Sequence, residues 1–238
     1  MSKAVLKIQK DLLAALGEKL EGFYLAGGTA LALFYFQHRL SEDLDFFTQQ
    51  FERARVVRII EEMKRQFPRK PITLEAEQSR PERARMMIYY VHWTKKEFIK
   101  IDFVEDFLKL TKPLKVVDRI PVLSLEDIFL RKIFAITGAL QTTDQVGRKQ
   151  LVGGRQEAKD FYDLYCLSHT FMRLSKFAIE YCDAVRQEGI IHWFHTYDRF
   201  KMKTGLLDLK TNEKTDYREI ERHFKSEIDR LVEKGIGL

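Results

Sequence analysis

The feature that most constrains the fold is a short apolar run followed by two glycines, at residues 23–28. The run Phe23–Ala26 is typical of a buried strand, and the apolar segment after the glycines has the length of a helix. A strand that enters a helix through a glycine turn leaves backbone N–H groups exposed at the positive end of the helix dipole. Because glycine has no Cβ atom, an anion can approach its backbone closely. Gly27 and Gly28 therefore predict a phosphate-binding turn.

Two aspartates follow on a second expected strand. Asp43 and Asp45 are separated by one residue, and the period of two in a strand places both carboxylates on one face. Leu44 and Phe46 then point to the opposite face. Two carboxylates beside a phosphate-binding turn suit a pair of Mg²⁺ ions on a nucleoside triphosphate. The alternative is a helix hairpin in which Ser41 and Asp43 serve as caps.

A third aspartate belongs to a later extended run. In residues 98–104, alternation places Lys100 and Asp102 on one face and apolar side chains on the other. An aspartate in such apolar company either meets a cation or lies at the edge of a sheet. Together with Asp43 and Asp45, Asp102 completes a predicted metal site of three carboxylates.

The rest of the pattern predicts an α+β protein in two parts. Helical spacing covers residues 3–21 and 52–66, and extended runs follow at 72–77, 85–93 and 97–104. Later segments are helical in pattern, at 124–137, 155–171, 173–188, 190–202 and 215–234, whereas residues 138–154 predict a long mobile loop. We therefore expect a mixed sheet with flanking helices in residues 1–122 and an α-helical bundle in residues 123–238.

Composition argues for a cytoplasmic protein without a membrane segment. Apolar runs fall short of the ~20 residues that a membrane helix needs, and the N-terminus carries too many charges for a secretory signal. The two cysteines, Cys166 and Cys182, do not form a CxxC pair, which favours a reducing compartment. A formal net charge of +6 is compatible with a nucleotide or nucleic-acid partner but does not identify one.

The helical half contains further candidate residues. Lys132 lies in an apolar helix, where a lysine more often extends its ammonium group to the surface than takes part in chemistry. Asp163 falls one turn after Lys159 and Asp160, and the spacing of Lys159 and Asp163 suits a surface ion pair. Helical geometry alone therefore favours structural roles for these residues.

Together, the motifs resemble the AbiEii/AbiGii-type toxin nucleotidyltransferases, within the DNA polymerase β-like nucleotidyltransferase superfamily. The resemblance rests on Gly27-Gly28-Thr29, Arg39-x-Ser41-x-Asp43-x-Asp45, Lys132, and Arg155-x-x-x-Lys159-Asp160-x-x-Asp163. It covers most of residues 20–170. The implied fold is a nucleotidyltransferase-like mixed sheet with flanking helices, followed by a helical domain.

The resemblance also implies a set of site residues. Gly27, Gly28 and Thr29 would hold the triphosphate of an NTP, and Asp43, Asp45 and Asp102 would bind two Mg²⁺ ions, with Mn²⁺ as the alternative metal. Lys132 and Arg155 are expected to contact the nucleotide, and Lys159 with Asp160 to close the pocket. Arg39 and Ser41 would brace the acidic strand or touch phosphate oxygens.

We therefore expect a Mg²⁺-dependent enzyme that transfers a nucleotide from an NTP to RNA, such as tRNA, or to a protein. The resemblance implies the toxin of a type IV toxin–antitoxin pair, with an antitoxin protein as its partner. Two alternatives stay open: a nucleotidyltransferase that modifies a small molecule, and a non-catalytic module that binds nucleotides. The three aspartates argue against the second, because binding alone does not require all of them.

Overall fold

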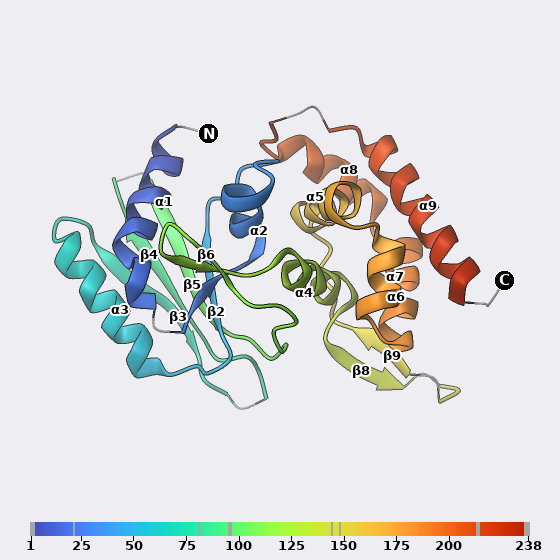
Figure 1. Ribbon diagram of the computed structural model, residues 1–238, viewed down its shortest axis with the longest axis horizontal. Helices are drawn as coiled ribbons and strands as arrows, with labels where there is room; N and C mark the ends of the chain where they lie inside the picture. Colours follow the sequence, from blue (N-terminus) through green and yellow to red (C-terminus); the bar gives the residue numbers. More distant parts are fainter. Residues whose placement is uncertain are drawn as a thin grey trace. The chain divides into compact units, whose positions relative to one another are not determined.

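The computed structural model describes residues 3–20, 22–80, 82–94, 97–143, 145–147, 149–212 and 215–235. The chain divides into two compact units, Met1–Ser124 (unit 1) and Leu125–Leu238 (unit 2). Figure 1 labels the helices and strands of both units. Across the described helices, none combines the length and the apolar character that a membrane span requires.

Unit 1 is built on a mixed sheet of seven strands in the order β3-β4-β5-β2-β1-β7-β6. The strands are β1 (Tyr24–Leu25), β2 (Leu44–Thr48), β3 (Ile72–Gln78), β4 (Met86–His92), β5 (Phe98–Glu105), β6 (Lys115–Val117) and β7 (Ile120–Val122). Strands β2 and β5 pair in parallel, as do β1 and β7, and the other neighbours are antiparallel. The extended runs that the sequence predicts are therefore confirmed.

The helices of unit 1 are α1 (Lys3–Leu16), α2 (Gly27–Ala30) and α3 (Arg53–Gln66), with short helical turns η1 (Gly17–Leu20) and η2 (Leu31–Tyr35). Helices α1 and α3 pack side by side, and α1 also contacts β5 and β7 (Figure 1). The two long helices, α1 and α3, each bury an apolar stripe at helical spacing, such as Val56, Ile59, Ile60 and Met63 of α3. The sheet and helices thus enclose one core.

Aromatic side chains fill the centre of that core. Phe103 of β5 is fully buried, and its ring centroid lies 5.2 Å from that of Phe23 and 5.6 Å from that of Phe46. Phe46 and Phe103 are register partners on the parallel strands β2 and β5. Because side chains alternate along a strand, this aromatic face leaves the neighbouring Asp45 and Asp102 on the other face of the sheet.

Unit 2 is mainly helical. Its helices are α4 (Leu125–Thr137), α5 (Ala158–Cys166), α6 (Leu174–Tyr181), α7 (Ala184–Thr196), α8 (Arg199–Asp208) and α9 (Tyr217–Gly235), with the turn η3 (Leu167–Phe171) after α5. The sequence pattern predicts 173–188 and 190–202 as continuous helices, which is wrong. Asp183 and Asp198 break them as N-caps, because their carboxylates accept hydrogen bonds from the backbone N–H groups of Arg186 and Lys201.

The predicted mobile loop at 138–154 is also wrong, because this segment contains a hairpin of β8 (Leu140–Thr143) and β9 (Lys149–Val152). Its strands are almost wholly exposed, so they lack the alternation of apolar and polar residues that reveals a strand. The base of the hairpin is held by α7: the Arg186 guanidinium donates to Thr137 Oγ1 at 2.6 Å and also to the Gly138 carbonyl. Tertiary contacts therefore order a segment whose local sequence suggests a loop.

The aromatic core predicts the first experiment. Phe103→Ala should lower the free energy of unfolding by about 3–5 kcal/mol, because it removes a fully buried ring and leaves a cavity. Phe107→Ala, in which the replaced side chain is 67% exposed, should change it by less than ~0.5 kcal/mol. Urea unfolding followed by circular dichroism measures both, and equal losses in the two variants would contradict this description of the core.

Candidate functional site

Two aspartates lie side by side in unit 1. Asp45 of β2 and Asp102 of β5 are register partners on adjacent parallel strands, which run ~4.8 Å apart. Asp43 immediately precedes β2 and its charge acts on the same lysine, Lys100, as those of Asp45 and Asp102, whereas Leu44 and Phe46 are fully buried. The structure therefore brings together the carboxylates that the sequence singles out.

A lysine belongs to the same cluster. Lys100 lies two residues before Asp102 on β5, and its Nζ is 2.6 Å from Asp102 Oδ2. Burial lowers the pKa of Lys100, but the hydrogen bond to Asp102 and the charges of Asp102, Asp43 and Asp45 outweigh it and raise the pKa above its usual value. The charges of all three carboxylates therefore act on the ammonium group of Lys100. Alternation along the strand predicts that Lys100 and Asp102 share a face, and this spacing of two residues is the sequence signal for the pair.

The glycine turn lies directly against Asp45. Gly27 has φ +68°, and a Cβ atom built on it would lie 2.7 Å from Asp45 Oδ2. A side chain at this position would therefore meet both an unfavourable backbone conformation and the carboxylate. Gly28 follows in the first turn of α2 and is buried. The first N–H groups of a helix lack partners within the helix, so the turn places hydrogen-bond donors beside the carboxylates.

Other predicted residues brace the turn between α2 and β2. The Thr29 hydroxyl donates to the Asp43 carbonyl oxygen at 2.5 Å and lies 2.7 Å from Ser41 Oγ. Because Thr29 has one hydroxyl proton, Ser41 is the donor in the second contact. The amide of Gln9 on α1, for which no local sequence signal predicts a role, donates to the Ser41 carbonyl oxygen at 2.9 Å. The side chains of Thr29 and Ser41 thus hold the acidic segment in place.

Arg39 lies in the same segment and is 7% exposed. Its Nη1 donates to the Leu40 carbonyl oxygen at 2.8 Å. Bracing is one of the two roles that the sequence leaves open for Arg39, and this contact fits it.

Unit 2 contains a separate buried ion cluster. Lys132 Nζ of α4 lies 2.7 Å from Asp160 Oδ1 and 2.6 Å from Asp163 Oδ2, both on α5. The Lys132 side chain is 8% exposed and both aspartate side chains are 0% exposed. The expectation that Lys132 extends to the surface is wrong, because its ammonium group is held inside by two carboxylates.

The cations beside this cluster differ in their surroundings. Arg155 Nη2 lies 3.0 Å from Asp160 Oδ2, although its side chain is 56% exposed. Lys159 lies exposed on α5, whereas Asp163 is buried and pairs with Lys132. The predicted surface ion pair between Lys159 and Asp163 is therefore wrong: helix spacing allows it, but α4 supplies a better-buried partner.

Comparison with known proteins assigns this arrangement to a family. The sequence profile described as "Nucleotidyl transferase AbiEii toxin, Type IV TA system" matches residues 11–235. The chain belongs to this family. It is a nucleotidyltransferase, and the resemblance that the glycine and aspartate motifs suggest is confirmed. Among curated proteins, none gives a significant match to the chain.

Solved structures share the fold of this chain. JHP933 from Helicobacter pylori aligns with a TM-score of 0.58 at 18% identity, over 100% of this chain and 97% of that chain. Another H. pylori crystal structure gives 0.60 at 18% identity, over 98% and 99% of the two chains. MenT4, a nucleotidyltransferase toxin of Mycobacterium tuberculosis, gives 0.57 at 14% identity, over 96% and 83%. The α+β fold expected from the sequence is thereby confirmed.

The carboxylates of unit 1 match the usual protein ligands of Mg²⁺ in part. Within the described residues, no group of three or more His, Cys, Asp or Glu side chains is arranged to hold a metal ion, and Asp102 is engaged by Lys100. Mg²⁺ at nucleotide sites is usually bound by one or two carboxylates, with phosphate oxygens and water as its other ligands. Asp43 and Asp45 fit that pattern, and the site of three carboxylates stays a prediction.

The glycine turn generates a prediction for this nucleotidyltransferase. Gly27→Ala should reduce nucleotidyl transfer about 100-fold, because its Cβ displaces the Asp45 carboxylate, and a ~1 Å misplacement can cost that much. It should also lower the unfolding free energy by about 1–2 kcal/mol through its positive φ.

Gly22→Ala is the matched control for Gly27→Ala. Gly22 also has a positive φ, +87°, but its nearest neighbour is the flexible Arg55 side chain. The unfolding free energy of Gly22→Ala should fall about as much as that of Gly27→Ala, whereas its transfer activity should persist. Activity assays and urea unfolding of both variants provide the comparison, and equal activities would contradict a contact between Gly27 and Asp45.

The buried cluster of unit 2 generates a second prediction. Lys132→Met should lower the unfolding free energy by about 3–5 kcal/mol, because two buried carboxylates lose their cation. Arg155→Gln, which removes an exposed partner of Asp160, should cost less than ~1 kcal/mol. Urea denaturation measures both variants. A loss of similar size in the two would show that Lys132 is not the cation on which the cluster depends.

Proposed function

We propose that this AbiEii-family enzyme transfers a nucleoside monophosphate from an NTP to an RNA acceptor, with tRNA as the first candidate. The observation that carries the proposal is the contact between the glycine turn and the paired aspartates. Gly27 lies against Asp45, and Asp45 is the register partner of Asp102. A triphosphate needs this combination of backbone N–H donors and carboxylates that can hold a cation.

In the proposed site, Asp43 and Asp45 hold Mg²⁺, or Mn²⁺ in its place, and the resemblance implies a second ion. Bound Mg²⁺ supplies Lewis-acid stabilisation of the negative charge on the phosphates. The N–H groups of Gly27, Gly28 and Thr29 supply further stabilisation without reorganisation during the reaction. Lys100 adds a positive charge beside the carboxylates.

Asp102 has two candidate roles in this site. It can serve as a further metal ligand, or it can accept the proton of the attacking hydroxyl group. In either role Asp102 acts beside the Lys100 ammonium group, which lies 2.6 Å from its Oδ2. A metal role predicts that excess Mg²⁺ partly rescues Asp102→Asn, whereas a proton-acceptor role predicts a loss that Mg²⁺ does not relieve.

The roles of the unit 2 residues in catalysis rest on the resemblance alone. Lys132 and Asp160 are bound to each other inside unit 2, which supports a structural contribution. Lys159 and Arg155 are exposed and carry positive charge, so they are the better candidates for contacting a phosphate. Their assignment to the nucleotide stays a prediction.

Two further parts of the proposal concern the acceptor and the biological setting. The name of MenT4 describes a nucleotidyltransferase toxin, and the family description names a type IV toxin–antitoxin system. We infer that an antitoxin protein counteracts this enzyme and that both act in the cytoplasm, where NTPs and RNA are available. A protein or a small molecule is the alternative acceptor, and the family assignment argues against a binding-only module.

The test is a transfer assay with purified protein, Mg²⁺, each of the four labelled NTPs and total tRNA. The wild type should place label in RNA with one NTP preferred. Asp45→Asn should reduce the label at least about 100-fold, because a charge that stabilises the transition state is lost. Asp11→Asn, an exposed aspartate on α1, removes the same charge outside the site and should retain activity.

The outcome also separates the acceptors. Label in protein instead of RNA would identify a protein as the acceptor and leave the proposed site unchanged. Label in neither RNA nor protein would sink the RNA proposal, and activity in Asp45→Asn equal to that of Asp11→Asn would overturn the carboxylate site itself.

A further inference from the structure

Three aromatic residues, Tyr90, His92 and Phe98, form a ring cluster on β4 and β5 of unit 1. His92 and Phe98 are register partners on these antiparallel strands, and Tyr90 is the partner of Lys100. The ring centroid of Phe98 lies 4.9 Å from that of Tyr90 and 6.2 Å from that of His92. Phe98, Lys100 and Asp102 alternate along β5, so the ring cluster shares a face of the sheet with Asp102.

The ring cluster is open to solvent, whereas the opposite face of the same strands is not. Val91 of β4 and Ile99 of β5 are fully buried in the core. Phe98 is 53% exposed, and Tyr90 and His92 are half-buried. Cross-strand aromatic pairs stabilise a sheet, and burial of the rings would add to that effect. The ring cluster is therefore apolar surface that folding leaves uncovered on the face of the carboxylates.

Lys100 lies between the ring cluster and the acidic site. It is two residues from Phe98 and two from Asp102 on β5, and its Nζ is 2.6 Å from Asp102 Oδ2. At ~3.3 Å per residue, each of these steps along the strand is about 7 Å. The rings thus begin one side-chain position beyond the carboxylates, with a positive charge between them. A cation beside exposed rings matches the phosphates and bases of a nucleic-acid strand.

The ring cluster and the glycine turn lie on opposite sides of β2 in the sheet. The strand order in this region is β4-β5-β2-β1, and the turn at Gly27 follows β1 and contacts Asp45 of β2. In phosphoryl transfer the attacking and leaving oxygens lie roughly in line across the phosphorus atom. With the leaving pyrophosphate at the glycine turn, the attacking group comes from the side of β5 and β4. The ring cluster lies on that side.

We propose that the ring cluster binds an unpaired base of the RNA acceptor, which stacks on Phe98 near the hydroxyl group that attacks the nucleotide. The inference rests on the proposed function, because it takes Asp45 and Asp102 as the reacting centre. Bases within a duplex are already stacked on their neighbours, so a single-stranded loop or end is needed to offer a base to a protein ring. The acceptor is therefore single-stranded where it meets β4 and β5. The base of the NTP is the competing occupant, and the experiments distinguish the two.

The first experiment measures RNA binding without an NTP, so that no transfer occurs. Fluorescence anisotropy of a short, end-labelled single-stranded RNA of mixed sequence gives its affinity for the full chain. Phe98→Ala should weaken binding at least about fivefold, because stacking on one base is lost. Phe98→Trp, which keeps an aromatic surface, should retain the affinity. The same RNA annealed to its complement should bind equally to the wild type and to Phe98→Ala.

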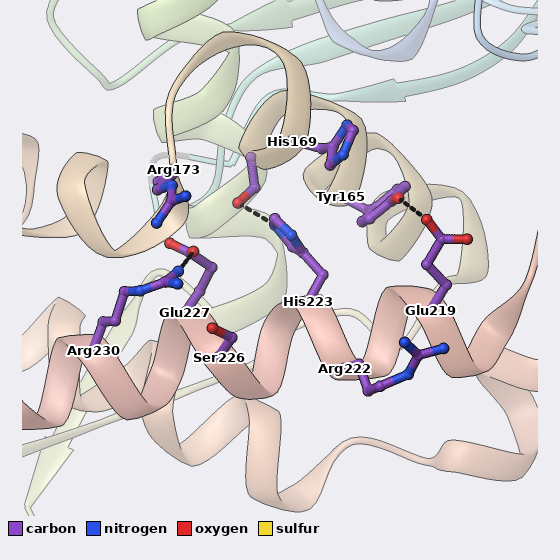
Figure 2. A pocket seen from close by; sticks show the side chains of 10 residues that line it. Tyr165, His169, Arg173, Glu219, Arg222, His223, Ser226, Glu227 and Arg230 are labelled. Carbon is purple, nitrogen blue, oxygen red and sulfur yellow. Dashed lines mark hydrogen bonds and ion pairs between the residues drawn. The ribbon is translucent and has the colours of Figure 1, made fainter.

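Two variants control for the loss of aromatic surface elsewhere. Phe107→Ala removes a phenylalanine that is 67% exposed and follows the far end of β5. His169→Ala removes a ring from a second aromatic group, which Tyr165, His169 and His223 form beside a cavity of unit 2 (Figure 2). Both variants should bind the single-stranded RNA like the wild type.

Tryptophan emission tests the stacking itself. In Phe98→Trp the added emission should be quenched when the single-stranded RNA binds, because the indole lies against a base. Phe107→Trp should show no such change. Urea unfolding of Phe98→Ala tests a purely structural role, which predicts a lower unfolding free energy with unchanged RNA affinity.

Kinetics assign the ring cluster to the acceptor or to the donor. With tRNA and the preferred NTP, Phe98→Ala should raise KM for tRNA at least about fivefold and leave KM for the NTP unchanged. A rise in KM for the NTP alone would overturn the proposal and assign the rings to the base of the donor.

Two further results would overturn the proposal: RNA affinity that Phe98→Ala leaves unchanged, and equal weakening by Phe107→Ala or His169→Ala. The failure of this proposal is distinguishable from that of the proposed function. RNA binding that depends on Phe98, in a chain that transfers no nucleotide, would refute the proposed transfer alone. Transfer to RNA with unchanged affinity and KM in Phe98→Ala would refute the role of the ring cluster alone.

Discussion

The parallel pairing of β2 with β5 is the interaction on which the site depends. It joins Asp45 to Asp102 and Phe46 to Phe103 in the same register. Because side chains alternate along each strand, a shift by one residue would move the aromatic rings to the carboxylate face and the carboxylates into the core. Burial of the phenylalanines therefore fixes the position of the acidic groups. The core and the candidate site are two faces of one pairing.

Lys100 and Lys132 both pair with aspartates, but in different surroundings. In unit 1, the charges of Asp102, Asp43 and Asp45 all act on the ammonium group of Lys100. In unit 2, Lys132 is buried between Asp160 and Asp163, and the exposed Arg155 pairs with Asp160 from outside. Carboxylates beside a glycine turn suit a ligand site, whereas an ion cluster buried between α4 and α5 suits the fastening of these two helices.

Tertiary structure changes the interpretation of segments whose local pattern is weak. The β8–β9 hairpin has almost no buried side chains, and its base is held by Arg186 from α7. The pairing of Asp163 with Lys132 likewise joins residues on different helices, although Lys159 is closer in sequence. Such contacts between distant segments are invisible to a pattern that covers only neighbouring residues.

The sequence by itself determined the strand–glycine–helix entry, the spacing of Asp43 and Asp45, and the face on which Asp102 lies, because backbone geometry sets these features within a few residues. It also carried enough of the family pattern to indicate a nucleotidyltransferase. Only the tertiary structure decided that Gly27 touches Asp45, that Lys100 joins the carboxylates, and that Lys132 is buried between two aspartates. These contacts depend on which strands and helices become neighbours, and burial of the whole core selects those neighbours.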